Sequence, residues 1–224
     1  MLAEQLSRRS YDQVEASAGV LAHRGCWSRL EDKNSLVALT TGLDRGYGLE
    51  TDVRDWDGKL VVSHDPPGRG ALLLETLFEH YQSIGSTACL ALNVKSDGLA
   101  EEMCRLIEKH TIENYFVFDM SIPDTLSYLR CGLRVYTRQS EFETQASLYE
   151  ECEGVWLDAF RDDWYSQDTL IQHIDNGKQV AVVSPELHGR CHEKVWQLVR
   201  GLPEKYTQKT FICTDLPESF EESK

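Results

Sequence analysis

Short apolar runs recur along this 224-residue chain, and polar, helix-like stretches separate them. Several runs are almost continuously apolar, which is typical of strands buried on both faces of a parallel sheet. The pattern predicts eight strands, at residues 20–22, 48–53, 90–94, 115–118, 133–136, 154–157, 179–183 and 211–213. A further extended segment at 60–63 follows the turn signal Asp57-Gly58.

Helical spacing of apolar residues predicts helices between these runs. Asn34 and Ser35 cap the first helix, and Gly46 ends it. Pro123 lies near the first turn of a short helix that begins around Ser121. In chain order, the predicted helices span residues 35–45, 72–83, 99–110, a short stretch from 121, 141–151, 166–176, 188–199 and 217–222.

Eight alternations of strand and helix predict an α/β fold, a single-domain (β/α)8 TIM barrel. The length suits one domain. We expect residues 1–17 to be a polar lead-in and residues 18–224 to form the barrel. A doubly wound open sheet is the rival, but it usually has fewer strands and a glycine-rich phosphate turn, and the sequence has no GxGxxG or Walker loop.

Composition and charge narrow the possible partners. Hydrophobic residues make up 41% of the chain, and no apolar run is long enough to span a membrane. The net charge of −14 disfavours nucleic acid or an anionic membrane as the main partner. The first residues lack the apolar core of a signal peptide, and the seven cysteines form no CxxC pair. We therefore expect a cytoplasmic protein with reduced thiols.

The candidate chemistry begins in the first quarter of the chain. Two apolar runs end in the histidines His23 and His64, and Glu50 and Asp52 lie between them. Side chains at i and i+2 leave the same face of a strand, so these carboxylates lie about 7 Å apart along it. Such a pair can share one hard cation. Two imidazoles beside a bound cation suit acid/base chemistry on a phosphate.

The same residues carry a family resemblance. His23-Arg24-Gly25, Asn34-Ser35, Glu50-Thr51-Asp52 and the segment Asp-Gly-Lys-Leu-Val-Val-Ser-His-Asp at 57–65 occur in this order. Together they resemble the motifs of the glycerophosphodiester phosphodiesterase family. Lys33 departs from the family, which has Glu before this Asn. The resemblance is specific in the first 65 residues and looser in the second half.

The resemblance implies a TIM-barrel phosphodiesterase that uses a divalent metal, Mg²⁺ or Ca²⁺. Asn93-Val94-Lys95 stands where the family has Glu-Ile-Lys, so the third metal ligand of the family is replaced by Asn93. Asn93 binds the metal directly or through water, or Asp119 replaces it, or the metal is held poorly. We favour a retained site built on Glu50 and Asp52. Catalysis then falls to His23 and His64, with fixed positive charge from Arg24 and Lys95.

Polar residues also follow the strands of the second half, where a barrel places its active site. The candidate substrate-binding residues are Arg138, Trp156, Asp158, Glu186 and Arg190. The two arginines suit a second anionic group, or else form salt bridges with Glu141 and Glu186. Trp27, Trp56, Trp156 and Trp164 form a stacking wall or pack in the rim and core. Thr214-Asp215 resembles the family's closing motif, and we expect it to cap a helix.

These observations predict hydrolysis of a small soluble phosphodiester, glycerophosphodiester-like or with a sugar or polyol part. A cyclising lyase that stops at a cyclic phosphate is the close alternative. A non-catalytic phospho-ligand-binding barrel is the alternative from another class, and Asn93 is the residue that permits it. A barrel hydrolase acting on other substrates ranks last. The oligomeric state stays open.

Overall fold

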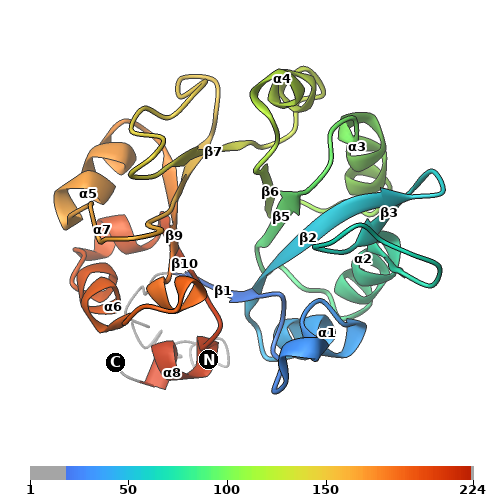
Figure 1. Ribbon diagram of the computed structural model, residues 1–224, viewed down its shortest axis with the longest axis horizontal. Coiled ribbons are helices and arrows are strands. Elements are labelled where there is room, and N and C mark those ends of the chain that lie inside the picture. Colours follow the sequence, from blue (N-terminus) through green and yellow to red (C-terminus); the bar gives the residue numbers. More distant parts are fainter. Residues whose placement is uncertain (1–18, 223–224) are drawn as a thin grey trace, which may run out of the picture.

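The computed structural model describes residues 19–222, so the lead-in expected at residues 1–17 lies outside them. Within this range eight parallel strands form a ring with helices outside it (Figure 1). In ring order these strands are β1 (Gly19–His23), β2 (Gly48–Trp56), β5 (Leu90–Val94), β6 (Tyr115–Phe118), β7 (Tyr136–Gln139), β8 (Gly154–Leu157), β9 (Gln179–Val183) and β10 (Thr210–Thr214). The predicted α/β TIM barrel is confirmed.

Backbone pairing runs around almost the whole ring. The first and last strands pair in parallel through Val20 and Ile212, which joins the two ends of the chain. The join between β6 and β7 is weaker, since it consists of one parallel bridge between Val117 and Val135. The amide of Val117 donates to the carbonyl of Arg134 there at 2.8 Å. This seam is the least strongly paired part of the described barrel.

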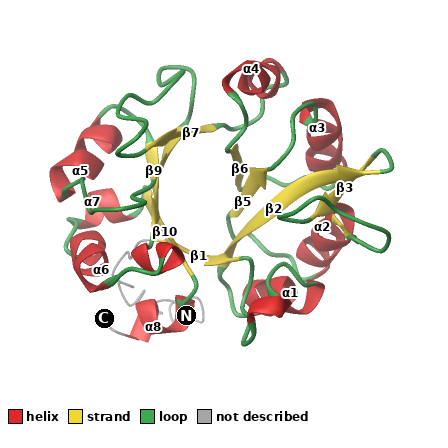
Figure 2. Ribbon diagram, in the orientation of Figure 1, coloured by secondary structure: helices red, strands yellow, loops and turns green. Residues whose placement is uncertain are grey.

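Helices cover the outside of the ring (Figure 2). They are α1 (Leu36–Asp44), α2 (Leu74–Ser83), α3 (Ala100–Lys109), α4 (Ile122–Arg130), α5 (Gln167–Asp175), α6 (Glu193–Arg200), α7 (Glu204–Thr207) and α8 (Pro217–Glu222). Two antiparallel strands, β3 (Lys59–Val62) and β4 (Leu72–Leu73), extend the sheet beside β2, and short 3₁₀ turns occupy Leu30–Asp32 and Pro185–His188. No helix in residues 19–222 is both long and apolar enough to cross a membrane.

The helix predicted at residues 141–151 is wrong, because this segment is an irregular loop. Its start is fixed by Ser140, whose hydroxyl accepts hydrogen bonds from the amides of Phe142 and Glu143. Leu148 has a positive φ of 54°, which a continuing helix does not allow. The backbone is thus held by local side-chain bonds that compete with helix formation.

Other errors concern boundaries. The strand predicted at 133–136 is shifted to Tyr136–Gln139, since Val135 forms only the seam bridge. The helix predicted from residue 188 starts at Glu193, because Gly189 follows the 3₁₀ turn in the left-handed region at φ 70°. The helix predicted from residue 72 starts at Leu74, since the preceding two residues pair with β3.

The barrel interior is packed with apolar side chains that alternate along the strands. Phe116 and Tyr136 stack there with their ring centres 3.7 Å apart and their planes 5° from parallel. The next strand presents Gly154 to this stack, and a Cβ on Gly154 would lie 2.5 Å from the Tyr136 ring. The complete interior cluster consists of Leu21, Cys89, Ala91, Phe116, Phe118, Tyr136, Trp156, Ala181, Val183 and Cys213.

We expect Gly154→Ala to lower the free energy of unfolding by about 1–3 kcal/mol, because the added methyl group displaces the buried Tyr136 ring. Urea unfolding followed by circular dichroism measures this change. Gly68→Ala is the matched control, since a Cβ there meets no atom within 4 Å. Equal unfolding midpoints for the two variants would contradict the packing described here.

Candidate active site

Two buried carboxylates lie within β2, on the part of the strand that pairs with β5. The side chains of Glu50 and Asp52 leave the same face of the strand, and the residues are 1% and 0% exposed. Asn93 on β5 is paired in register with Asp52. Its side-chain amide donates a hydrogen bond to Glu50 Oε1 at 3.2 Å. The predicted acidic pair and the residue predicted beside it are therefore brought together.

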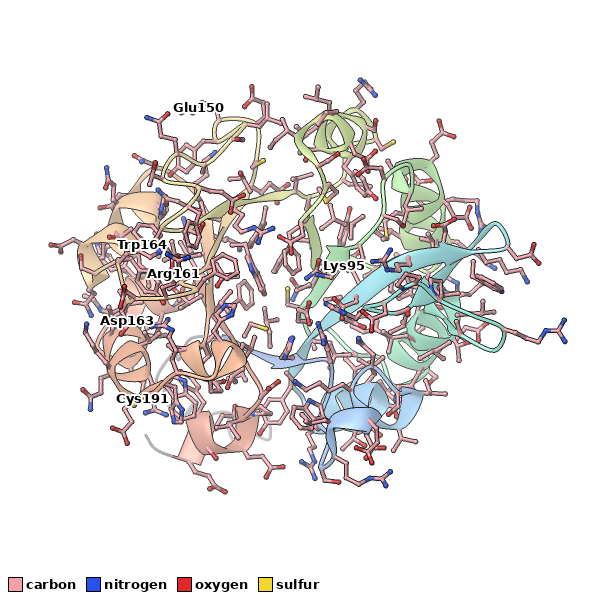
Figure 3. The ribbon with its side chains drawn as sticks, viewed as in Figure 1. Lys95, Glu150, Arg161, Asp163, Trp164 and Cys191 are labelled. Carbon is pink, nitrogen blue, oxygen red and sulfur yellow. The ribbon has the colours of Figure 1, made fainter. Side chains whose placement is uncertain are left out.

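Cationic and amide groups surround Asp52. Arg24 Nε lies 2.7 Å from Asp52 Oδ2, and Lys95 Nζ lies 3.4 Å from Oδ1. Asn34 donates from its amide to Oδ2 at 2.8 Å and accepts a hydrogen bond from Thr51. Lys95 points toward the centre of the ring (Figure 3). Two fixed positive charges therefore meet at the barrel mouth beside the acidic pair.

The loop that delivers these groups has an unusual backbone. Arg24 and Asn34 are in the left-handed region at φ 57° and 61°, and Asp119 at the end of β6 is there at 71°. Non-glycine residues adopt this conformation only when their surroundings enforce it, and such residues cluster at functional sites. Gly25 follows at φ 88°, and a Cβ there would lie 2.5 Å from the backbone of Ala38. This close approach explains the glycine of the His-Arg-Gly motif.

His23 is held between two carboxylates. Its Nδ1 lies 2.6 Å from Asp215 Oδ1, and its Nε2 lies 3.7 Å from Glu50 Oε2. Asp215 is in turn bound by Lys33, whose Nζ lies 3.0 Å from Oδ2. The Lys33 ammonium also lies 4.3 Å from the Trp27 ring centre. One continuous row of polar contacts therefore joins Lys33 to Asp215, Asp215 to His23, and His23 to Glu50.

The pKa values of the two carboxylates beside His23 shift in opposite directions. Burial raises the pKa of Glu50, and the charge of Asp52 raises it further, which outweighs the nearby cations. Burial also acts to raise the pKa of Asp215, but the bonds and charges of His23 and Lys33 outweigh it and hold that pKa below 3.8. Asp215 is therefore ionised at neutral pH and can orient His23.

A divalent metal fits the donor atoms at this site. Within residues 19–222, Glu50 Oε2, Asp52 Oδ1 and Asn93 Oδ1 are buried and accept no hydrogen bond, although Lys95 Nζ lies 3.4 Å from Asp52 Oδ1. Unpartnered carboxylate and amide oxygens are the ligands that Mg²⁺ and Ca²⁺ prefer. In residues 19–222 no group of three His, Cys, Asp or Glu side chains is close enough together to hold a metal ion. An all-protein site here therefore depends on the Asn93 amide.

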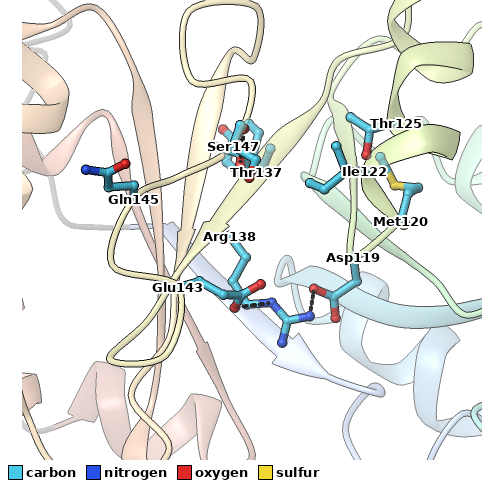
Figure 4. A pocket seen from close by; sticks show the side chains of 10 residues that line it. Asp119, Met120, Ile122, Thr125, Thr137, Arg138, Glu143, Gln145 and Ser147 are labelled. Carbon is cyan, nitrogen blue, oxygen red and sulfur yellow. Dashed lines mark hydrogen bonds and ion pairs between the residues drawn. The ribbon is translucent and has the colours of Figure 1, made fainter.

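Asp119 is a poorer candidate for the third ligand. Its carboxylate lies 3.7 Å from Lys95 Nζ and 2.9 Å from Arg138 Nη2. Arg138 also lies 3.3 Å from Glu143 Oε2 (Figure 4). Asp119 thus joins β6 to β7 across the weak seam. The adjacent cavity, of about 60 Å³, has room for only a few water molecules.

Among the described residues, no hydrogen bond or ion pair links His64 to Glu50 or Asp52. The His64 side chain is 49% exposed, and within the described residues its ring nitrogen Nδ1 contacts Asp65 at 2.9 Å. The backbone just before it is anchored to β2, since Ser63 donates its amide hydrogen to the carbonyl of Asp52 at 3.0 Å. The pairing of His23 with His64 across one metal ion stays a prediction.

The candidate substrate-binding residues are dispersed. Arg190 contacts Asp163 at 2.8 Å and the carbonyl of Ala159 at 2.7 Å, whereas Arg138 binds Asp119 and Glu143. The salt bridges weighed for these arginines thus exist, but with other carboxylates than the expected Glu141 and Glu186. Arg161, Asp163 and Trp164 lie outside β9, away from the ring centre where Lys95 points (Figure 3).

Trp156 and Glu186 have packing roles. Trp156 is 5% exposed and stacks on Phe118 at 4.0 Å inside the barrel, so it is part of the floor and no stacking wall. Glu186 accepts hydrogen bonds from the hydroxyls of Ser184 and Thr214 and from the amide of Asp215. It ties the end of β9 to the end of β10 and so fixes Asp215 opposite His23.

Sequence reasoning missed four residues of the site. Asp215 was expected to cap a helix, Lys33 was noted only as a departure, and Asn34 was assigned to a helix start. His188 was not singled out, although its Nε2 lies 2.7 Å from the buried Asp158. One signal in the sequence could have indicated these contacts, because Asp215 and Asp158 directly follow predicted strands, where a barrel places its active site. Their pairing with particular histidines joins distant parts of the chain and has no local signature.

Comparison with known proteins supports the fold. No protein-family model matches this chain, and no curated protein matches it. A glycerophosphodiester phosphodiesterase from Agrobacterium tumefaciens str. C58 is similar in structure at TM-score 0.66 and 16% identity, covering 92% of this chain and 99% of that one. A glycerophosphoryl diester phosphodiesterase from Parabacteroides distasonis follows at 0.65 and 12%, covering 94% and 87%.

A third similar structure is a Ca²⁺-dependent phosphatidylinositol-specific phospholipase C from Streptomyces antibioticus. Its TM-score is 0.56 at 9% identity, and the match covers 92% of this chain and 96% of that one. At such low identities these likenesses are likenesses of fold. They support the barrel fold and leave the chemistry of this chain to be argued from its side chains.

We expect Asp215→Asn to lower the free energy of unfolding near neutral pH by about 1–3 kcal/mol, because a partly buried, charge-assisted hydrogen-bond network loses its charge. The pKa of Asp215 is lowered in the folded state, so its contribution is present above its ordinary pKa of 3.8 and disappears as the pH falls through the folded value. The difference from wild type therefore narrows at acid pH. Urea unfolding across the pH range measures this.

Asp65→Asn is the matched control for that experiment. Asp65 also binds a histidine ring, at 2.9 Å, but its side chain is 88% exposed. Its substitution is expected to change the unfolding free energy by less than about 0.5 kcal/mol. If both variants lose the same stability, the partly buried location of Asp215 has no special energetic role.

Proposed function

We propose that this protein is a metal-dependent phosphodiesterase that acts on a small phosphodiester. The observation that carries the proposal is the position of His23, which is held by Asp215 beside the buried Glu50–Asp52 pair. Arg24 and Lys95 add positive charge to the same barrel mouth. The likeness of fold to glycerophosphodiester phosphodiesterases supports this reaction class.

His23 is suited to accept a proton. The hydrogen-bond network assigns the Nδ1 proton to the bond with Asp215, which leaves a lone pair on Nε2 in the neutral ring. Nε2 can therefore take the proton of an attacking hydroxyl or water. Glu50, 3.7 Å from Nε2, stabilises the imidazolium that results. Asp215 keeps the ring in the correct tautomer and orientation.

Arg24 and Lys95 are suited to bind the phosphate. Both contact Asp52, which fixes their positions. Guanidinium and ammonium groups form charge-assisted hydrogen bonds to phosphate oxygens. They also explain how a chain of net charge −14 can attract an anion, since the local field at a site differs from the net charge.

Glu50, Asp52 and Asn93 are the residues that would hold Mg²⁺ or Ca²⁺. The metal supplies positive charge that polarises a phosphate oxygen when it is bound. An amide oxygen carries no net charge, so the site is weaker than one with three carboxylates. We therefore propose low metal affinity as a property of this protein.

The shape of the interior favours a small substrate. Phe118 and Trp156 stack across the barrel below the mouth and close it from the centre of the fold. A polyol or sugar phosphodiester, such as a glycerophosphodiester, is the default substrate. The cyclising lyase differs only in its product, which phosphorus NMR distinguishes by a cyclic phosphate that persists instead of a monoester.

His23→Ala is expected to lower kcat by on the order of 10²-fold or more, because the proton of the attacking group loses its acceptor. A panel of glycerophosphodiesters with Mg²⁺ or Ca²⁺ measures the rate. His80→Ala is the matched control, since His80 lies on α2 and binds Asp44 at the surface. Full rate in the His23 variant would remove this residue from the mechanism.

Asn93→Asp is expected to tighten Ca²⁺ binding by on the order of tenfold, because a third carboxylate joins the donor set. Without metal the same variant is expected to be less stable than wild type, since three buried carboxylates repel one another. Calorimetric titration with Ca²⁺ and melting curves with and without chelator test both effects. Failure of both proteins to bind Ca²⁺ or Mg²⁺, with no turnover of the substrate panel, would favour a non-catalytic phospho-ligand-binding barrel.

A further inference from the structure

A cavity of about 420 Å³ lies outside the strand ring, between α1 and α8. These helices lie on either side of β1, where the two ends of the ring join (Figure 1). The cavity is lined by residues 26–28 after β1, by residues 215–219 after β10, and by Thr41 and Arg45 of α1. One end of the cavity is therefore on the side of the barrel where the strands end, next to the candidate active site.

Two wall residues connect this cavity directly with His23. Asp215 lines the cavity, and its Oδ1 lies 2.6 Å from Nδ1 of His23. Trp27 also lines it, and its indole N–H donates a hydrogen bond to the carbonyl of His23 at 3.0 Å. This position suits the alcohol part of a phosphodiester whose phosphate is bound at the barrel mouth.

The cavity has the size of a ligand site, and its walls are held in place. Small-molecule sites usually have volumes of about 300–1,000 Å³. The Lys33 ammonium lies 4.3 Å from the Trp27 ring centre and 3.0 Å from Asp215 Oδ2, so it connects these two walls. Arg45 on α1 forms an ion pair with Glu218 on α8, and both line the cavity. The walls are thus positioned by contacts that the protein makes without a ligand.

The charges in the walls are already paired, and this pairing decides the class of ligand. Asp215 is paired with Lys33. Glu218 is paired with Arg45. A cationic group would compete with the Lys33 ammonium for the Trp27 ring, whereas an anionic group would meet two carboxylates. An uncharged polar group avoids both kinds of repulsion.

Hydroxyl groups can use the hydrogen-bonding capacity that the paired charges leave. A carboxylate oxygen accepts more than one hydrogen bond, and a guanidinium group has five N–H donors. Ser28 and Thr41 add hydroxyls to the walls. The flat ring of Trp27 offers an apolar surface with a fixed orientation. Such walls fit a ring that is apolar on its faces and carries hydroxyls at its edge.

We propose that the cavity between α1 and α8 binds the alcohol part of the substrate and selects an uncharged sugar or cyclic polyol. The inference rests on the proposed phosphodiesterase function. It concerns the recognition of the substrate and leaves the proton transfers as described. Trp27 supplies the surface for the ring, and Arg45, Glu218 and Asp215 supply partners for its hydroxyls.

Two glycerophosphodiesters test this selectivity. Glycerophosphoinositol carries an uncharged cyclic polyol, whereas glycerophosphocholine carries a cation on the same glycerophosphate. We expect kcat/KM of the wild type, with Mg²⁺ or Ca²⁺, to be at least about tenfold higher for glycerophosphoinositol, because its hydroxyls find partners in the cavity. Rates of monoester release measured by phosphorus NMR give both values.

Thr41→Tyr is expected to lower kcat/KM for glycerophosphoinositol by on the order of tenfold and for glycerophosphocholine by less than about threefold, because the larger side chain fills the cavity. Ser28→Tyr, on the exposed loop, narrows the same cavity and serves if the helix variant is unstable. Thr40→Tyr is the matched control. Thr40 neighbours Thr41 on α1 but lies outside the cavity lining, and its hydroxyl donates to the carbonyl of Leu36 at 2.9 Å.

Saturation-transfer NMR with free myo-inositol gives a second measurement, which needs no turnover. We expect transfer to myo-inositol from the wild type and from Thr40→Tyr, and loss of this transfer in Thr41→Tyr. Free choline, at the same concentration, is expected to show no transfer that Thr41→Tyr removes. Melting temperatures of all variants identify any loss that comes from unfolding.

The outcomes separate this inference from the proposed function. Turnover of both substrates with equal kcat/KM, or equal losses in folded Thr41→Tyr and Thr40→Tyr, would overturn the inference and leave the phosphodiesterase in place. A preference for glycerophosphocholine that Thr41→Tyr removes would assign the cavity to a cation and also overturn it. If the wild type turns over no phosphodiester, the proposed function fails. Transfer to myo-inositol that Thr41→Tyr abolishes would then still support a polyol site, and its absence would overturn that site too.

Discussion

The burial of two carboxylates side by side is the constraint on which the rest of this structure depends. Glu50 and Asp52 lose nearly all contact with water within β2, and like charges in a low-dielectric interior repel strongly. The surrounding cations and hydrogen-bond donors offset this electrostatic cost. Arg24 and Lys95 flank Asp52, while Asn93 and His23 face Glu50. The same positive charges that permit the pair to be buried can also attract a phosphate.

The barrel makes this arrangement possible because it brings the ends of all its parallel strands to one side. Its interior below the mouth is filled by stacked aromatic rings, including Phe116, Tyr136, Phe118 and Trp156. This packing gives a rigid floor, and the charged residues project above it. The Asp119–Arg138 ion pair spans the one place where backbone pairing nearly stops. Charged residues of the mouth thus also hold the scaffold together.

Much of the fold was predictable because parallel strands buried on both faces leave a strong apolar signal in the sequence. The strands at 90–94, 115–118, 154–157 and 179–183 match their predicted bounds. The loop at 141–151 was not predictable in this way, since its conformation depends on bonds made by Ser140 and on the left-handed backbone of Leu148. The spacing of apolar residues indicates which positions are buried. It does not show where side-chain hydrogen bonds to the backbone replace those of a helix.

The sequence by itself determined the barrel and the presence of His23, Glu50 and Asp52 on two neighbouring strands, because alternation along a strand fixes which side chains share a face. Only the tertiary structure decided which groups pair. Asp215 reaches His23 across 192 positions, and Asp158 reaches His188 from the next strand of the ring. It also left the His64 side chain 49% exposed. Such partners are chosen by ring closure and loop geometry, which bring together residues that no spacing along the chain relates.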